Sequence, residues 1–200
     1  MDDIIRRIES SDNPLSADVF FVQGREYTYI VDVGSNDEAF EAVRSVPQKK
    51  IIITHFHADH AENLRRLNLT DEDLYVGDYT AKYYGVGTVI SKPVHLEDGV
   101  VIDILPLPSS HAKGSLTVIV NRKVVLLGDG CYCNIKGYNV SLLHDTLAVL
   151  KAAEFETAIK SHESKTYTRE ELINELETIY SLKEKNEPYI SLAKLKGVTT

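Results

Sequence analysis

The sequence lacks several features that mark whole classes of protein. Only two of its 200 residues are cysteines, Cys131 and Cys133, and two positions apart in an expected loop they are poorly placed for a disulfide. The longest apolar runs, such as VVLL at 124–127, are strand-sized and too short to cross a bilayer. The first residues, MDDIIRRIES, lack the apolar centre of a secretory signal. We therefore expect a cytoplasmic protein with no membrane partner.

Positive charge is also scarce. The chain has 22 Lys and Arg against 30 Asp and Glu, which gives a formal net charge of -8. Nucleic acid is an unexpected partner, because phosphate binding draws on clustered basic side chains. Hydrophobic residues make up 43% of the chain, the balance of a soluble globular protein, and no Pro/Ser/Gly-rich linker interrupts it. We expect one domain over residues 1–200.

Strand-like and helix-like patterns alternate along the chain, which predicts an α/β fold. The runs 18–24 and 27–34 flank the turn Gln23–Glu26 and predict an antiparallel hairpin, and Asn121-Arg122 joins two later strands. Strands followed by helices occur in both halves, so we expect two similar βα layers packed sheet against sheet. Helices are predicted over 35–46, 58–69, a short stretch from 78, 141–153 and 168–185. Ser35 or Asn36 is the expected N-cap of the first, and Thr168 and Glu171 are spaced as a capping box at the start of the last.

Ligand-type side chains are concentrated in THFHADH, directly after the apolar strand at 49–53. His55 and His57 are two positions apart, so in an extended segment both imidazoles lie on the same side. Asp59 and His60 follow where the chain should bend into a helix. Imidazole and carboxylate groups are ligands that Zn²⁺ and Fe²⁺ accept readily, so this loop is a candidate metal site.

Further ligand types stand at the ends of later strands. His111, Asp129 and His162 each follow an apolar strand. Loops at one edge of a rigid scaffold are where binding and catalytic residues collect, and we expect these loops to meet the first one there.

The ordered motifs VDVGS, HFHADH, PSSHAKGSL, LLGDG and KSHES resemble those of the metallo-β-lactamase superfamily of binuclear metallohydrolases, with spacing most similar to glyoxalase II. The resemblance covers roughly residues 15–165 and implies a four-layer αββα sandwich. It implies that one metal is held by His55, His57 and His111, the other by Asp59, His60 and His162, with Asp129 bridging them.

The resemblance further implies a hydrolase that acts on a small-molecule substrate: an ester, thioester, lactone or phosphodiester. Two divalent cations lower the pKa of a shared water, and Asp59 can orient that water and take up its proton. Zn²⁺ is the expected ion, with iron and manganese as alternatives. Asp32, at the end of its strand, is expected to fix a loop or a ligand imidazole from behind.

The sequence departs from the family pattern beside two ligands. Ser110 precedes His111, and Ser161 and Glu163 flank His162, at positions where the family usually has glycine. Serine resists the positive φ that glycine allows, so the turns there are expected to differ. Glu163 also adds negative charge near the site. After His162 only 38 residues follow, fewer than glyoxalase II uses for its C-terminal helical domain.

The segment GDGCYCNIKGYN after the bridging position is the least generic part of the chain. Lys136, Tyr132 and Tyr138 are candidates for binding a substrate carboxylate or phosphate, although a solvated lysine is an equally good interpretation. We interpret Cys131 and Cys133 as buried small residues, with metal ligation or redox chemistry as alternatives. Tyr83 and Tyr84 are interpreted as packing residues of a short helix, and lining the site is the alternative.

Two other functions stay open. An iron-dependent redox enzyme of the persulfide dioxygenase type is suggested by the thiols near the site and by the tolerance of these ligands for iron. A non-catalytic metal-binding protein is suggested by the unusual flanks of His111 and His162. The remaining histidines, His95 and His144, are interpreted as structural or solvated.

Overall fold

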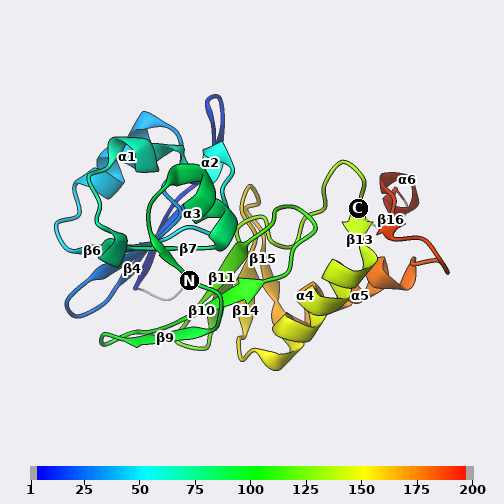
Figure 1. Ribbon diagram of the computed structural model, residues 1–200. Helices are drawn as coiled ribbons and strands as arrows, with labels where there is room; N and C mark the ends of the chain where they lie inside the picture. Colours follow the sequence, from blue (N-terminus) through cyan, green and yellow to red (C-terminus); the bar gives the residue numbers. More distant parts are fainter. Residues whose placement is uncertain (1–3, 197–200) are drawn as a thin grey trace.

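Apolar side chains alternate between the two faces of each strand, and this alternation builds the layers of the fold. In the computed structural model, which describes residues 4–196, Ile51 and Ile53 pack toward helices on the outside of one sheet. Ile52 between them packs against the second sheet. The result is an αββα sandwich: two six-stranded sheets lie face to face, with helices on both outer faces (Figure 1).

The first sheet has the order β1-β4-β5-β6-β7-β8. Its last four strands run parallel to one another, and β1 and β4 are antiparallel to their neighbours. The strands are β1 (Ile5–Ile8), β4 (Val19–Gln23), β5 (Thr28–Val31), β6 (Lys49–Ile52), β7 (Leu74–Val76) and β8 (Thr88–Val89). Its helices are α1 (Asp37–Arg44), α2 (Ala58–Ala61), α3 (Asp78–Tyr84) and the 3₁₀ turns Glu62–Arg66 and Asp71–Asp73.

The second sheet has the order β15-β14-β12-β11-β10-β9, and only β12 and β14 pair in parallel. Its strands are β9 (Val94–Glu97), β10 (Val101–Leu107), β11 (Ser115–Val120), β12 (Val124–Leu126), β14 (Thr157–Ile159) and β15 (Thr166–Thr168). Helices α4 (Val140–Ala152) and α5 (Arg169–Ser181) cover its outer face. Near the C-terminus, β16 (Tyr189–Ile190) pairs with β13 (Tyr138–Asn139), and α6 (Leu192–Leu195) follows.

The space between the sheets is filled by branched aliphatic side chains. Val22 and Val31 of the first sheet and Ile104, Val118 and Leu126 of the second are fully buried there. Burying one such side chain stabilises the fold by about 1.5–3 kcal/mol. This apolar layer fixes the two sheets against each other and so fixes the loops at their edge.

Local sequence signals are confirmed at several element ends. The Asn36 side chain accepts a hydrogen bond from Ala39 N and caps α1. Thr168 and Glu171 form the predicted capping box of α5. Asn121 and Arg122 both have positive φ, 52° and 55°, as the predicted tight turn between β11 and β12 requires.

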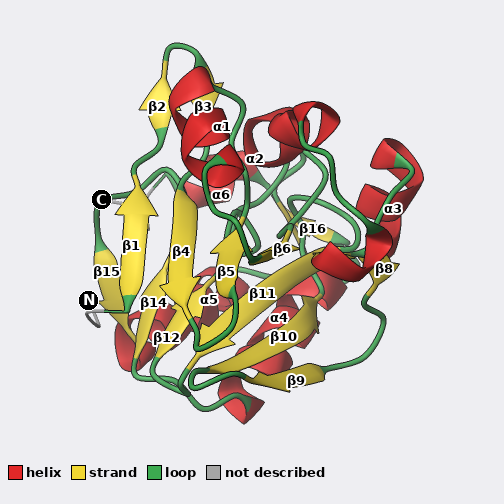
Figure 2. Ribbon diagram, turned by 90° about the vertical axis from the view of Figure 1, so that its left-hand side faces the viewer, coloured by secondary structure: helices red, strands yellow, loops and turns green. Residues whose placement is uncertain are grey.

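The N-terminal segment differs from the prediction. The predicted hairpin is β4–β5, but β1 precedes it, and β2 (Ser11–Asp12) and β3 (Leu15–Ser16) form a small hairpin that projects beyond the sheet (Figure 2). The sequence IRRI gives no clear strand signal, because two of its four residues are arginines. In the structure these arginines lie over aromatic rings of β4, with Arg6 Cζ 3.8 Å from the Phe21 ring centre and Arg7 Cζ 5.6 Å from that of Phe20.

Two predicted helices are shorter than expected. The helix predicted over 58–69 is the single turn α2 followed by a 3₁₀ turn, and the helix predicted over 168–185 ends at Ser181. Among the described residues, no helix combines the length and the apolar character needed to cross a bilayer.

Candidate metal centre

Four loops bring ligand-type side chains to one edge of the sandwich. The loop after β6 carries His55, His57, Asp59 and His60, and the loops that follow β10, β12 and β14 carry one ligand type each. All seven residues predicted from the sequence lie together, in two groups whose ligand atoms are within 4.8 Å of one another: His55, His57 and His111, and Asp59, His60, Asp129 and His162.

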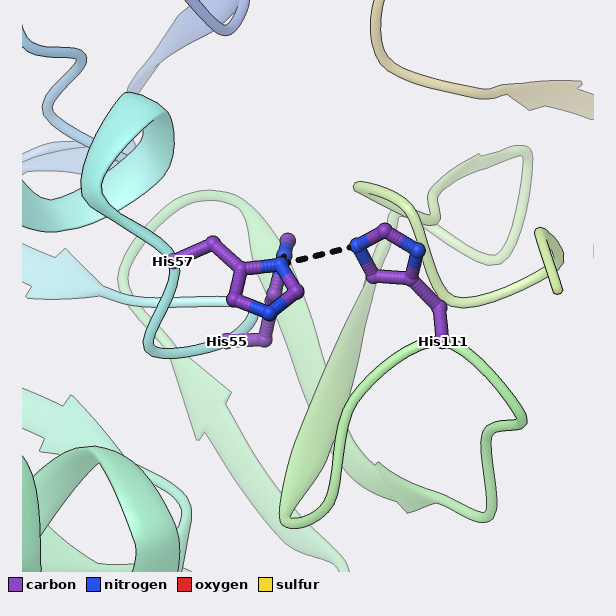
Figure 3. A group of neighbouring side chains, drawn as sticks. All are labelled: His55, His57 and His111. Carbon is purple, nitrogen blue, oxygen red and sulfur yellow. Dashed lines mark hydrogen bonds between the residues drawn. The ribbon is translucent and has the colours of Figure 1, made fainter. Parts of the chain in front are cut away.

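The first group, here called the three-histidine group, consists of imidazoles alone. His57 Nδ1 lies 3.0 Å from His55 Nε2 and 2.9 Å from His111 Nε2 (Figure 3). His55 is buried, and His57 and His111 are partly exposed. Three nitrogens therefore converge on one point that is open on one side.

The second group, here called the mixed group, combines imidazoles with carboxylates. Asp59 Oδ2 lies 3.1 Å from His162 Nε2 and 3.5 Å from His60 Nε2. Its members come from α2 and from the loops after β12 and β14. Two nitrogens and two carboxylate oxygens are a donor set that suits Zn²⁺ or iron.

Asp129 lies between the two groups. Its Oδ2 is 3.3 Å from His111 Nε2, while its Oδ1 is 3.3 Å from His60 Nε2 and 3.8 Å from His162 Nε2. Each oxygen of this carboxylate thus faces a different group. A single side chain can serve both groups as a shared ligand.

Two buried polar atoms of the mixed group lack a hydrogen-bond partner in the part of the chain that the structure describes. His60 Nε2 and Asp129 Oδ1 make no aligned hydrogen bond with the other described residues. Leaving such atoms unsatisfied costs about 1–3 kcal/mol each. Both point into the cluster of ligand atoms, so the residues present fit a bound cation.

His60 is held from behind by Asp32. The Asp32 Oδ2 atom lies 2.7 Å from His60 Nδ1, and the same carboxylate accepts hydrogen bonds from the backbone and the hydroxyl of Thr54. Asp32 has φ +60°, a conformation that aspartate tolerates better than most residues. It orients the His60 ring so that Nε2 faces the cluster, the arrangement common around metal-binding imidazoles.

His162 is held by a buried aspartate, Asp18, which directly precedes β4 of the other sheet. Asp18 Oδ2 accepts a hydrogen bond from His162 N (2.9 Å) and from Ser161 Oγ (3.2 Å), and Asp18 Oδ1 pairs with Arg7 Nε at 2.7 Å. Arg7 also donates to the carbonyl of Glu163. These bonds secure a loop in which His162 itself adopts φ +64°.

Two imidazoles of the three-histidine group, those of His55 and His57, have lowered pKa values and favour the neutral form. Burial lowers the pKa of His55 well below its usual value, and the neighbouring imidazoles add to this effect. Burial and then His111 lower the pKa of His57. Neutral imidazole is the form that ligates a metal ion.

The mixed group has the opposite charge pattern. Burial disfavours the charged form of His60, but Asp32 and Asp129 outweigh burial and raise its pKa to about 10. The hydrogen bond with Asp59 raises the pKa of His162. Burial raises the pKa of the Asp59 carboxyl, yet His162 and His60 together lower it below its usual value, so this carboxylate is ionised at neutral pH.

The serines that replace glycine contribute hydrogen bonds. Ser110 Oγ accepts from Asn139 N, and Ser110 O accepts from Asn134 Nδ2, which ties the third-histidine loop to the segment 134–139. Neither Ser110 nor Ser161 adopts a positive φ; His162 does so instead.

Glu163 lies in a polar network beside the site. Its carboxylate accepts hydrogen bonds from Tyr132 Oη (2.7 Å) and Tyr167 Oη (2.5 Å), and Lys160 Nζ is 4.0 Å away. Lys160 is itself buried and pairs with Glu175 at 2.6 Å. The negative charge of Glu163 is therefore largely compensated by its neighbours.

The three candidate substrate-binding residues have different surroundings. Lys136 is exposed, with Nζ 5.8 Å from the Tyr189 ring centre. The Tyr132 ring lies 6.5 Å from that of His111, but its hydroxyl is 2.7 Å from both Ser161 O and Glu163 Oε1, so its single proton is already shared between these acceptors. Tyr138 is buried, and its hydroxyl donates to Cys131 O, which leaves it unavailable to a substrate.

Several residues beside the ligands carry little signal in the sequence. Asp18 and Arg7 lie in a segment whose strand signal is weak, and their contacts with the His162 loop span more than 140 positions of the chain. The Phe56 ring lies beside His57, Tyr79 lies beside Phe56, and Lys113 lies over the Tyr79 ring. Phe56 and Lys113 are close in sequence to the histidine loops, whereas Tyr79 has no such signal. Tyr83, interpreted as a packing residue, is 60% exposed.

Fold and site together define an αββα protein with a histidine and aspartate cluster at one edge of its sheets. Residues 12–70 match the family model described as the metallo-beta-lactamase superfamily. The match covers less than a third of the chain, and the fold of the whole chain is shared with solved metallo-beta-lactamases. A search of curated proteins found no match to the sequence.

Solved structures share the fold at low sequence identity. The DIM-1 metallo-beta-lactamase matches with a TM-score of 0.69 at 17% identity, over 90% of this chain and 94% of that one. A metallo-beta-lactamase from Pontibacter korlensis has a TM-score of 0.60 at 14% identity, over 86% and 97%. A variant of the flavo di-iron protein from Thermotoga maritima has a TM-score of 0.65 at 11% identity, over 84% of this chain and 54% of that one. The present chain thus spans about half the length of that flavo di-iron protein.

Proposed function

We propose that this protein is a hydrolase that uses two divalent metal ions to cleave a small ester, thioester, lactone or phosphodiester. The observation that carries the proposal is the position of Asp129, whose two oxygens face different ligand groups at 3.3 Å. A carboxylate placed in this way suits two ions held side by side.

The three-histidine group would hold one ion and the mixed group the other, with Asp129 as shared ligand. Zn²⁺ is the ion we expect, since imidazole nitrogens and carboxylate oxygens are its usual ligands, and iron and manganese are the alternatives. The bound ions would supply a water of lowered pKa and would polarise the carbonyl or phosphoryl oxygen of the substrate.

Asp59 is the residue we assign to proton transfer. Its carboxylate is ionised at neutral pH, because His162 and His60 lower its pKa. Asp59 Oδ2 lies at the inner side of the mixed group, 3.1 Å from His162 Nε2. A carboxylate there orients the attacking water and accepts its proton at an Oδ atom.

The proposal is tested by hydrolysis of a panel of ester, thioester, lactone and phosphodiester substrates with zinc-loaded protein. At least one class should be cleaved, and His57→Ala should lower kcat/KM more than about a hundredfold, beyond the loss typical of a supporting residue. His144→Ala is the matched control, because this histidine is exposed and outside both groups. Full activity in His57→Ala, or no cleavage of any class, would contradict the proposal.

Iron-dependent redox chemistry is the second candidate, and the likeness to a flavo di-iron protein favours it. The thiols give it less support than the sequence suggested. Cys131 is buried, and burial raises the pKa of its thiol to about 12, which keeps it protonated and unreactive. Oxygen consumption by iron-loaded protein in the absence of hydrolysis would favour this candidate over the first.

A further inference from the structure

Three aromatic rings, one partly exposed and two exposed, extend outward from His57 of the three-histidine group. The Phe56 ring centre lies 4.8 Å from that of the ligand His57, 6.3 Å from that of Tyr79 and 5.9 Å from that of Tyr83. We call Phe56, Tyr79 and Tyr83 the aromatic wall. It begins in direct contact with a candidate metal ligand and continues outward along α3.

The wall is more exposed than packing alone would explain. Tyr79 is 38% and Tyr83 60% exposed, although aromatic side chains contribute most when buried. Exposed apolar surface that is continuous with a polar site is typical of ligand binding.

The helix that carries the wall is fixed against the loop of the third histidine. A Cβ added to Gly77, at the N-terminus of α3, would lie 1.8 Å from the carbonyl oxygen of Gly114. Gly114 has φ +68°, and a Cβ there would lie 2.4 Å from Asp78 Oδ1. This close approach of two backbones requires glycine on both sides and sets Tyr79 beside the ligand loops.

Two cations lie at the wall: Arg65 is paired with Glu62 (Nε–Oε1 3.2 Å), whereas Lys113 forms no ion pair with the other described residues. Lys113, two residues after His111, places Nζ 5.5 Å from the Tyr79 ring centre, and Arg65 Cζ lies 5.7 Å from that of Tyr83. Cations on the ring faces disfavour a cationic occupant and attract an acidic one. Lys113 is exposed, so its ammonium group is accessible to a ligand.

We infer that the aromatic wall selects substrates in which a flat aromatic group lies next to the cleaved bond, with an acidic substituent bound by Lys113. Stacking on Tyr79 and Tyr83 would position the aromatic group while the reacting oxygen lies at the three-histidine group. This inference rests on the proposed function, since it assigns the substrate class of the same site.

Hydroxamates that share one metal-binding headgroup test the inference without turnover. Their Kd values for zinc-loaded protein would be measured by titration calorimetry. Benzohydroxamate should bind about tenfold more tightly than acetohydroxamate, and a few-fold more tightly than cyclohexanecarbohydroxamate, which is equally apolar but not flat. The better of 3- and 4-carboxybenzohydroxamate should bind more tightly again.

Single substitutions test whether the preference for the phenyl probe comes from the aromatic wall. Tyr79→Ala and Tyr83→Ala should each remove most of the preference for the phenyl probe and leave acetohydroxamate binding unchanged. Tyr27→Ala is the matched control, because Tyr27 also lies beneath a cation, Lys50 Nζ at 4.9 Å, but on the β4–β5 turn at the other end of the strands. Lys113→Ala should remove the gain from the carboxylate, whereas Lys82→Ala, a loss of the same charge on α3, should not.

The outcomes distinguish this inference from the function on which it rests. Equal affinity for the phenyl, cyclohexyl and methyl probes, or a phenyl preference that survives both tyrosine variants, would overturn the aromatic subsite while leaving the metal centre standing. Failure of every hydroxamate to bind zinc-loaded protein would overturn both.

Discussion

The two ligand groups differ in what holds them. The three-histidine group contains imidazoles only, and two of its three members come from one short loop. The mixed group contains two carboxylates, and buried aspartates support it from behind, Asp32 at His60 and Asp18 at His162. Both groups need segments that are distant in sequence, but the mixed group needs more of them, since its ligands come from α2 and two loops and its supporting aspartates from two further segments.

The difference extends to charge. Burial lowers the pKa of His55, whereas carboxylates raise the pKa values of His60 and His162. One cluster thus combines a partly open group, in which His55 and His57 favour the neutral form, with a charged group that buried aspartates support. Asp129 is the member that belongs to both.

Replacing Asp129 should have the largest effect, because both groups lose a ligand. We expect Asp129→Asn to weaken the binding of both ions by more than about a hundredfold, beyond the loss typical of a supporting residue. Equilibrium dialysis against zinc followed by elemental analysis measures this. Two tightly bound ions in the variant would show that the groups are independent.

Replacing Asp18 should lower the stability of the protein and weaken metal binding at the mixed group, but not at the three-histidine group. The Asp18 side chain is fully buried and its partner Arg7 nearly so, and breaking a buried ion pair costs about 3 kcal/mol. We expect Asp18→Asn to lower the free energy of unfolding by about that amount and to release the ion of the mixed group first. Denaturant unfolding and metal titration measure the two effects.

Asp12→Asn provides the control, since this aspartate is exposed on the small N-terminal hairpin. If Asp18→Asn weakened both ions equally, the claim that Asp18 supports the mixed group would be wrong.

Replacing Asp32 should have a smaller and more local effect. Asp32→Asn keeps the shape of the side chain but loses the charge that orients His60. Losses of this kind lower metal affinity by about 10- to 100-fold. Cobalt substitution reads out the two groups separately by their absorption spectra, and only the mixed-group spectrum should change. A change in the spectrum of the three-histidine group instead would show that Asp32 does not act on the mixed group alone.

Much of the ligand set was predictable because each ligand follows a recognisable strand. HFHADH stands directly after β6, and His111, Asp129 and His162 stand at the ends of strands whose apolar patterns are plain. The repetition of strands and helices in both halves predicted two βα layers packed sheet against sheet, and the family resemblance implied the four-layer αββα arrangement that the structure has.

Of the two supporting aspartates, Asp32 was expected from its place at the end of a strand, whereas Asp18 was not predictable. Asp18 meets His162 across 144 positions, and a hydrogen bond between such distant residues leaves no periodic signal in the sequence. Tyr138 shows that a residue type in a loop can also suggest a role that the structure does not support. A tyrosine in a polar loop suggested a substrate contact, but pairing of β13 with β16 buries it.

The smallest expected effect concerns the core next to the Asp129 loop. Burial raises the pKa of the Cys131 thiol from 9.0 to about 12. Because the unfolded thiol loses its proton first, the free energy of unfolding should fall as pH rises from about 9 to 12, by at most about 1.4 kcal/mol per pH unit from this residue. Denaturant unfolding of metal-free protein should show a shallower decline for Cys131→Ala. Identical slopes for both proteins would mean that the thiol is not shielded as the structure indicates.

The most direct test of the central claim is the metal content of the intact protein. Wild-type protein dialysed against zinc should retain two ions per chain, with anomalous diffraction placing one at the three-histidine group and one at the mixed group. Retention of no ion, or of ions bound elsewhere, would contradict the account.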